Sequence, residues 1–437
     1  MTDTITGAAP AALICAPGSG SGKSVITAGL ARLHRNAGRR VRVLKFGPDY
    51  LDPMVLERAS GQAVYQIHPW MTGEAECRWR LAEAAAEADL VLVESAMGLF
   101  DGEPSSADLA AMTGIPAVPV IDASGMAQTF AAIVHGLATY RDDVAVSGVI
   151  ANRTGSAGHG RMLAGCLPEA TPLLGSVTRS EVMGIPDRHL GLFQADEIEN
   201  LDARLDAMAE VLQEAGLDTL PAEVTLTGER PAVPPRLLEG VRIGLARDPA
   251  FAFVYPANLD LLRAMGAEVT EFSPIADEAL PECDALWFPG GYPELYGTEL
   301  AANTAMHEAI REHHQDGKPI LAECGGLMYA SRTLVDGDGE RHPMLGLVDA
   351  EAAMAGKLKG LGVQALDLAG GELRGHTFHH SELTTALEPV THTRRRGGSA
   401  AEAVYQVGAF TGSYFHGYFP SAPEAVAALF KGRARAA

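Results

Sequence analysis

The stretch Ala16-Pro17-Gly18-Ser19-Gly20-Ser21-Gly22-Lys23-Ser24 decides the fold of the first half of the chain. It follows a short apolar run, residues 11–16, that predicts a strand, and it leads into a helical pattern over residues 23–36. Glycines at such a junction let backbone N–H groups turn toward a phosphate, and the helix N-terminus adds a favourable dipole. The sequence therefore predicts a nucleoside-triphosphate loop, although Pro17 stands where the strict GxxxxGK(S/T) pattern has glycine. A plain Gly/Ser turn is the alternative.

The side chains of this loop predict nucleotide and metal binding. Lys23 is expected to reach the β- and γ-phosphates of ATP, and the Ser24 hydroxyl is expected to hold Mg²⁺. Mg²⁺ needs further oxygen ligands, which carboxylates at the carboxyl ends of neighbouring parallel strands can supply. Asp49 follows one predicted strand and Glu94 ends another, so both are predicted metal ligands. The other loop positions expected to contact ATP are Gly18, Gly20, Ser21 and Gly22.

The pattern around the loop predicts two α/β domains. Apolar strand patterns alternate with helical patterns, which is typical of a parallel sheet covered on both faces. Proline-rich residues 223–239 predict a linker, and a fresh α/β pattern follows. We expect a first domain over residues 1–222 and a second over residues 240–437. The expected strands are 11–16, 41–45, 90–94, 117–122, 146–151, 285–288 and 319–322, and the expected helices are 23–36, 74–88, 126–140, 258–265 and 299–314.

Composition excludes several classes of protein. The 437 residues carry 34 Lys and Arg against 55 Asp and Glu, and the resulting net charge of −21 argues against a general nucleic-acid binder. No uninterrupted apolar stretch of about 20 residues predicts a membrane span. The 5 cysteines are widely spaced and odd in number, so neither a disulfide framework nor a zinc site is indicated, and a reducing cytoplasm is the expected location.

A second candidate site centres on Cys324, which lies between a predicted strand and a predicted helix. Such a sharp turn exposes a nucleophile, and a helix N-terminus favours the thiolate. The N–H groups of Gly291 and Gly325 are expected to form an oxyanion hole, and His416 is the expected base. The alternative is that Cys324 is a small buried hydrophobe. The Gly290-Gly291 turn and the late histidine in the same half favour the nucleophile.

With these motifs together, the sequence resembles the cobyrinate/hydrogenobyrinate a,c-diamide synthases of cobalamin biosynthesis, which are glutamine-dependent, ATP-using amidotransferases. The resemblance covers nearly the whole chain, and the motifs come in the family's order. They are APGSGSGKS (16–24), KFGPDYLDP (45–53), VESAMGLFDG (93–102), PDRHLGL (186–192), FPGGYPELY (288–296), AECGGLMY (322–329) and GSYFHGYF (412–419).

The resemblance implies a P-loop domain similar to dethiobiotin synthetase and a second domain of the class I glutamine amidotransferase type. It implies that Cys324 is the glutaminase nucleophile and His416 its base. It further implies that Asn152 reads the adenine and that Asp52 and Asp101 bind the acetate groups of the substrate. The implied substrate is hydrogenobyrinic or cobyrinic acid, with glutamine as nitrogen donor, and the Ala- and Arg-rich composition favours the metal-free acid by association.

Two features depart from the family pattern or remain open. Class I amidotransferases carry a glutamate two residues after the catalytic histidine, where this chain has Tyr418. Either His416 works without that orienting group or another group replaces it, and Glu382 is one candidate replacement. A polycarboxylate substrate predicts a local basic pocket with Lys45 and Arg153, whereas Arg394-Arg395-Arg396 is expected in a solvated loop. A homodimer is the default expectation.

Three rival functions stay open at this point. A regulatory P-loop ATPase would carry a second lysine five residues before Lys23, where this chain has Gly18. A scaffold with an inactive glutaminase domain would use free ammonia only. A close relative would carry out the same chemistry on another tetrapyrrole.

Overall fold

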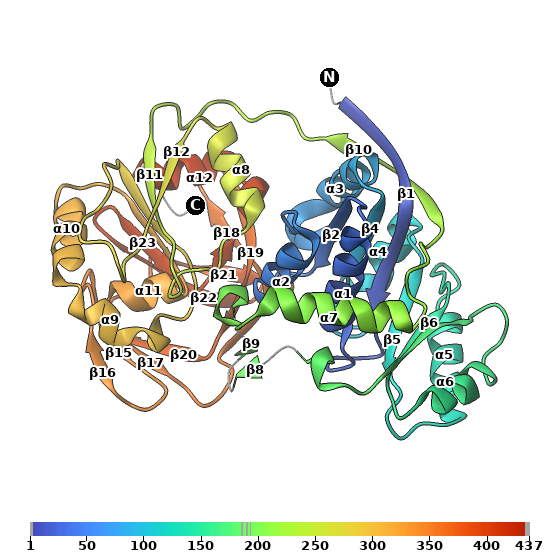
Figure 1. Cartoon of the computed structure of the whole chain (residues 1–437). Helices are drawn as coiled ribbons and strands as arrows, with labels where there is room; N and C mark the ends of the chain where they lie inside the picture. The colour runs from blue at the N-terminus through green and yellow to red at the C-terminus, as the bar shows by residue number, and fades with distance from the viewer. Residues whose placement is uncertain (1–2, 185–186, 189–190, 193, 433–437) are drawn as a thin grey trace. The chain divides into compact units, whose positions relative to one another are not determined.

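The phosphate-loop segment connects the first strand of a parallel sheet to the helix that covers it. The computed structural model describes residues 3–184, 187–188, 191–192 and 194–432. It divides into two units, Met1–Ala232 and Val233–Ala437, and each is described by itself (Figure 1). The motif residues Pro186, His189 and Leu190 lie outside the described residues.

The first unit contains a parallel sheet with the strand order β3-β2-β4-β1-β5-β6-β7. Its strands are β1 (Asp3–Cys15), β2 (Val41–Phe46), β3 (Tyr65–Ile67), β4 (Leu90–Glu94), β5 (Ala117–Asp122), β6 (Val149–Thr154) and β7 (Leu173–Thr178). Its helices are α1 (Lys23–Asn36), α2 (Leu51–Ser60), α3 (Glu74–Glu87), α4 (Ser106–Thr113), α5 (Thr129–Thr139), α6 (Ala157–Ala164) and α7 (Leu201–Glu214). The α/β prediction for this half is confirmed.

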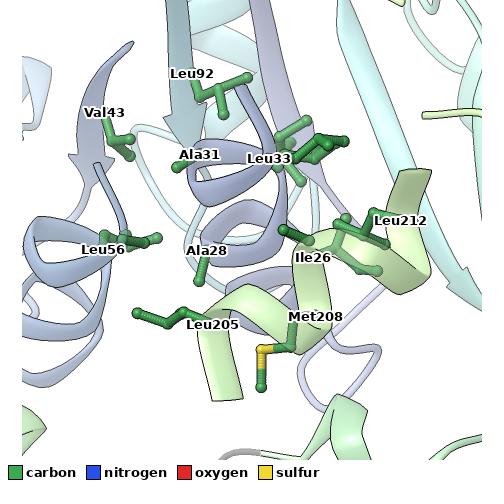
Figure 2. Close-up of a cluster of buried hydrophobic side chains, with 14 of the residues drawn as sticks. Ile26, Ala28, Ala31, Leu33, Val43, Leu56, Leu92, Leu205, Met208 and Leu212 are labelled. Atoms are coloured by element: carbon green, nitrogen blue, oxygen red, sulfur yellow. The ribbon is translucent and has the colours of Figure 1, made fainter. Parts of the chain in front are cut away.

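Helices cover both faces of this sheet, so the alternate residues of each strand, which point to opposite sides, are buried on both faces. In β1, Ala12 and Ile14 join the core beneath α1, α2 and α7, whereas Leu13 joins the core beneath α3 and α4. Figure 2 shows Leu205, Met208 and Leu212 of α7 packed against Ile26 and Ala28 of α1. The helix that begins in the phosphate loop is therefore fixed on two sides.

The segment expected as a linker differs from the prediction in its first half. Glu223–Arg230 forms β10, which pairs antiparallel with residues 3–10 of β1. This two-stranded ribbon lies against α3, and it lies very close: a Cβ on Gly7 would be 2.2 Å from the nitrogen of Ala86, and one on Gly228 would be 2.4 Å from the nitrogen of Trp79. Of the prolines that suggested a linker, Pro221 precedes the strand, and Pro231, Pro234 and Pro235 follow it.

The second unit is built on a mixed sheet with the order β12-β11-β13-β14-β23-β22-β21-β18-β19-β24, in which the strands from β12 to β23 are parallel. These strands are β11 (Arg242–Ala246), β12 (Glu268–Phe272), β13 (Ala285–Phe288), β14 (Ile320–Glu323), β18 (Gly360–Leu368), β19 (Gly371–His379), β21 (Thr391–Arg395), β22 (Ala400–Val407), β23 (Phe410–Ser413) and β24 (His416–Gly417). A smaller sheet, in the order β16-β15-β17-β20, contains β15 (Ser331–Val335), β16 (Arg341–Pro343), β17 (Val348–Met354) and β20 (Ser381–Thr385). The helices are α8 (Pro256–Ala264), α9 (Gly297–Ala302), α10 (Thr304–Gln315), α11 (Gly325–Ala330) and α12 (Pro423–Phe430).

Two sequence predictions for the second unit are wrong in detail. The single helix expected at 299–314 is divided into α9 and α10, because the Asn303 side chain accepts a hydrogen bond from Met306 N at 3.2 Å and caps a new helix. The arginine run expected in a loop begins in β21, where Arg394 pairs with Asp367 and Glu372. Across the described residues, no helix combines the length and apolar character needed to cross a membrane.

Candidate functional site

The phosphate loop has the backbone that its glycines predict. Gly22 caps α1 with φ +92°, a left-handed conformation that disfavours other residues. A Cβ on Gly22 would also lie 2.4 Å from Asn152 Nδ2, which donates to the Ser21 carbonyl oxygen at 3.0 Å. The Asn152 side chain on β6 therefore supports the loop. The sequence resemblance had implied that Asn152 reads the adenine. Arg153 helps Asn152 by donating to the Gly20 carbonyl at 3.0 Å and to Asp122 Oδ2 at 2.6 Å.

Lys23 is held between the loop and the turn that follows β4. Its ammonium donates to the Met97 carbonyl at 2.8 Å and lies 3.4 Å from the Gly18 carbonyl. Burial, and then the nearby Lys45 charge, outweigh the attraction of Glu94 and lower the pKa of Lys23. Asp101 shapes the same turn, because its Oδ2 accepts from Gly98 N at 2.9 Å.

Glu94 ends β4 with no solvent exposure, and its carboxylate is the centre of a polar cluster. Its Oε1 accepts from Ser24 Oγ at 2.7 Å and from Lys45 Nζ at 3.0 Å. Its Oε2 is buried and has no hydrogen-bond partner among the described residues. Burial raises the pKa of Glu94 to about 7, even though Lys45 acts in the opposite direction. An orphaned buried carboxylate oxygen beside a loop serine is a position that a cation suits.

Two aspartates complete this cluster around Lys45. Asp52 Oδ2 accepts from Lys45 Nζ at 2.5 Å, and Asp49 Oδ2 lies 3.7 Å from it. Burial disfavours the charged form of Asp52, but the charge of Lys45 outweighs it and lowers the Asp52 pKa. Burial and the neighbouring Asp52 raise the pKa of Asp49 to about 6. Asp49, Asp52 and Glu94 together face the single ammonium of Lys45, so the cluster keeps a net negative charge. The oxygen donors of Ser24, Asp49 and Glu94 therefore fit Mg²⁺ in charge and in ligand type.

The expected role of Lys45 in a basic substrate pocket is wrong. Its side chain is only 3% exposed, and its charge is satisfied by Asp52, Glu94 and Asp49. Burial acts against the charged form, but these carboxylates raise the pKa of Lys45 above its usual value. Lys45, which the sequence suggested as a substrate contact, instead compensates the negative charge of the acidic cluster beneath the loop.

In the second unit, Cys324 occupies a strained turn between β14 and α11. Its φ of +47° and ψ of −105° are rare for a residue with a side chain. The Cys324 N–H donates to the Ser413 carbonyl at 2.8 Å, which ties the turn to β23. Gly326 allows the helix to begin here, since a Cβ on it would lie 2.2 Å from the Phe288 carbonyl oxygen. Burial, and then Glu294, raise the pKa of the Cys324 thiol, so a base is needed to ionise it.

The Gly290-Gly291 turn contacts both the cysteine elbow and His416. A Cβ on Gly290 would lie 2.3 Å from His416 Cε1, and a Cβ on Gly325 would lie 3.0 Å from Gly291 N. A Cβ on Gly291 itself would lie 2.1 Å from the Ala250 carbonyl oxygen, so this turn accepts only glycine there. The structure therefore brings the predicted oxyanion glycines to one place, with His416 against the same turn.

His416 is 1% exposed and lies on β24, directly opposite His376 of β19. Burial lowers the pKa of His416 well below its usual value. The imidazole is therefore neutral near pH 7, which is the form that accepts a thiol proton.

The residues around His416 differ from those that the sequence suggested. Glu382 is exposed and pairs with Lys359, so the prediction that it orients His416 is wrong. Tyr418 is fully buried, and its ring packs edge-on against Tyr255 at 5.8 Å between centroids. The imidazole that does stack on His416 belongs to His376, at 4.9 Å and 15° between planes.

Glu323 is a functional candidate that sequence reasoning missed. It immediately precedes Cys324, and its buried carboxylate accepts from Gly417 N at 2.7 Å and from Trp287 Nε1 at 2.9 Å. Burial raises its pKa to about 7. The signal was available: a carboxylate that ends an apolar strand is costly without partners, the same argument that singled out Glu94.

Comparison with known proteins matches both halves of the chain. Residues 12–192 match the CobQ/CobB/MinD/ParA nucleotide binding domain, and residues 242–424 match the CobB/CobQ-like glutamine amidotransferase domain. The chain is 54% identical to a hydrogenobyrinate a,c-diamide synthase of Pseudomonas aeruginosa, over 96% of this chain and 97% of the relative. It is 53% identical to that of Stutzerimonas stutzeri, over 97% and 98%. It is 48% identical to a cobyrinate a,c-diamide synthase of Herminiimonas arsenicoxydans, over 97% of both chains.

Proposed function

Since the chain belongs to the hydrogenobyrinate/cobyrinate a,c-diamide synthase family, we propose that it amidates the a and c acetate carboxylates of hydrogenobyrinic acid. Glutamine supplies the nitrogen, and ATP activates each carboxylate. One observation carries this proposal: a single chain holds a phosphate loop over a buried carboxylate cluster and a cysteine on a strained elbow beside a neutral histidine. The first suits carboxylate activation, and the second suits glutamine hydrolysis.

The second unit carries out the glutaminase half-reaction in this proposal. Cys324 Sγ attacks the glutamine carboxamide carbon while His416 takes the thiol proton. The N–H groups of Gly291 and Gly325 donate to the carbonyl oxygen as it becomes negative. His416 returns the proton to the departing ammonia, and water then hydrolyses the thioester to release glutamate and restore the thiol.

The first unit carries out the synthetase half-reaction. The γ-phosphoryl group of ATP passes to an oxygen of the substrate acetate, which gives an acyl phosphate and ADP. Ammonia attacks the acyl carbon, phosphate leaves, and the amide forms. Lys23 and the N–H groups from Gly18 to Ser24 bind the phosphates, with Asn152 beside the loop. Asp52 and Asp101 are the proposed contacts to the acetate groups of the substrate. Ser24, Asp49 and Glu94 would hold Mg²⁺, which when bound neutralises phosphate charge.

The choice between the metal-free and the cobalt-containing corrin rests on the relatives. The relatives at 54% and 53% identity are named for hydrogenobyrinate, whereas one at 48% is named for cobyrinate. Because cobalt lies at the ring centre and amidation occurs at its edge, both acids belong in the test.

A mass-spectrometric assay tests the proposal. The purified protein receives Mg·ATP, glutamine and either hydrogenobyrinic or cobyrinic acid, beside a Cys324→Ala variant given glutamine or ammonia. Two amidations of one macrocycle are expected, lost in the variant with glutamine and restored by ammonia. ATP hydrolysis without amidation of either macrocycle would refute the synthetase assignment and favour the regulatory ATPase.

Location and assembly complete the proposal. All five cysteines are free thiols, which fits a reducing cytoplasm. A homodimer stays the expectation, and light scattering of the purified protein would decide it.

A further inference from the structure

The catalytic histidine is paired with a second histidine across two adjacent strands. His376 of β19 and His416 of β24 are direct antiparallel partners, and their rings stack at 4.9 Å with 15° between planes. The neighbouring pair, Gly375 and Gly417, brings the two strands unusually close: a Cβ on Gly375 would lie 1.9 Å from the His416 carbonyl oxygen. The backbone is therefore shaped so that the two imidazoles lie face to face.

His376 is itself fixed by a buried phenol. Tyr255, fully buried at the start of α8, places its hydroxyl 2.9 Å from His376 Nδ1. When that hydroxyl donates, the proton of His376 lies on Nε2 and the ring is neutral. A neutral ring can face His416 both before and after His416 accepts a proton, whereas a second imidazolium would repel it.

Tyr418 contacts Tyr255 and so supports this arrangement. It stands where class I amidotransferases carry the glutamate of the triad, and its ring packs edge-on against Tyr255. The ring of Tyr255 also contacts that of His376, and His376 stacks on His416. Tyr418, at the position of the missing carboxylate, is therefore linked to His416 through the rings of Tyr255 and His376.

We propose that His376, oriented by Tyr255, is the positioning residue of His416 in glutamine hydrolysis, in place of the triad carboxylate. A stacked ring fixes the plane of His416, and the plane decides whether its nitrogen points at the Cys324 thiol. This inference rests on the proposed glutaminase activity.

The test measures steady-state glutamine hydrolysis and, separately, amidation supported by free ammonia. His376→Ala is expected to lower kcat for glutamine about 100-fold, with the KM for glutamine within about threefold of wild type. His376→Phe, which keeps a flat ring against His416, is expected to recover most of that loss, and Tyr255→Phe to lose about fivefold. Ammonia-supported amidation should stay unchanged in all three. His313→Ala removes an equally buried imidazole of the same unit and serves as the matched control.

The outcomes separate the inference from the proposed function. A wild-type protein without glutaminase activity would refute the proposed function itself. An active wild type with unaltered kcat in folded His376→Ala would overturn the positioning role, as would an equal loss in His376→Phe and His376→Ala. If His376→Ala fails to fold, the Tyr255→Phe and His376→Phe pair decides, because both keep the volume of the ring.

Discussion

A single methyl group at residue 290 tests whether His416 is the base of the cysteine site. A Cβ there would lie 2.3 Å from His416 Cε1, whereas ordinary van der Waals contact begins at 3.4 Å. The imidazole of Gly290→Ala must therefore move by 3.4 − 2.3 = 1.1 Å. It cannot move freely, because it is buried and stacked on His376. No left-handed φ is involved at residue 290, so the effect falls on His416 and not on the backbone.

A displacement of about 1 Å at a reacting group typically costs about 100-fold in rate. Glutamine hydrolysis by Gly290→Ala should fall by that factor, or about 2.7 kcal/mol in activation free energy. The assay is coupled detection of glutamate, with ammonia-supported amidation measured in parallel and expected to be intact. Gly337→Ala is the control, since a Cβ on Gly337 meets nothing within 4 Å. Wild-type glutaminase activity in a folded Gly290→Ala protein would refute the placement of His416.

Three further predictions concern buried charge and loop shape. Burial raises the pKa of Glu323 to about 7 in the folded state, so the protonated side chain stabilises the fold fully below about pH 4.5, and this stabilisation is lost as the pH rises toward 7. Urea unfolding should therefore show that the free energy of unfolding falls by up to about 3 kcal/mol over that range. The fall should be smaller in Glu323→Gln. Lys45→Met leaves the buried carboxylates Asp52 and Glu94 uncompensated and should lower the free energy of unfolding by about 3–5 kcal/mol. Lys359→Met removes an exposed ion pair and should change the free energy of unfolding far less. Equal losses in the two variants would contradict the compensating role of Lys45. Gly22→Ala combines a φ of +92° with a clash against Asn152 and should weaken ATP binding at least tenfold by calorimetry, with glutaminase activity preserved; wild-type affinity would show that the loop tolerates a side chain.

Features that depend on neighbours in sequence could be predicted. The phosphate loop is a local signal, since its glycines, its lysine and the adjoining strand and helix are contiguous. Glu94 could also be predicted, because a charge at the end of an apolar strand needs a partner wherever that partner comes from. The identity of the partner could not: Lys45 lies 49 positions away, and only the pairing of β2 with β4 brings them together.

Features that depend on strand pairing between distant residues were missed. His376 precedes His416 by 40 positions, and nothing in the sequence of either strand indicates that they are opposite each other. The strand β10 was obscured by the prolines that follow it, although its alternating Val224 and Leu226 point toward the core beneath α3. Lys45 was assigned to the substrate because charge alone suggests a carboxylate partner, and the protein's own carboxylates fill that role.

The ribbon formed by β1 and β10 decides where the chain can be cut. A fragment that ends at residue 222 would keep residues 3–10 of β1 but lose the strand that pairs with them. Their backbone N–H and C=O groups would then form an open sheet edge, and open edges recruit strands from other molecules. Separate expression of the ATP-binding half therefore requires the chain to continue at least to Arg230, the last residue of that strand, and the aggregation of the shorter fragment would reflect a lost partner strand and not an unstable core.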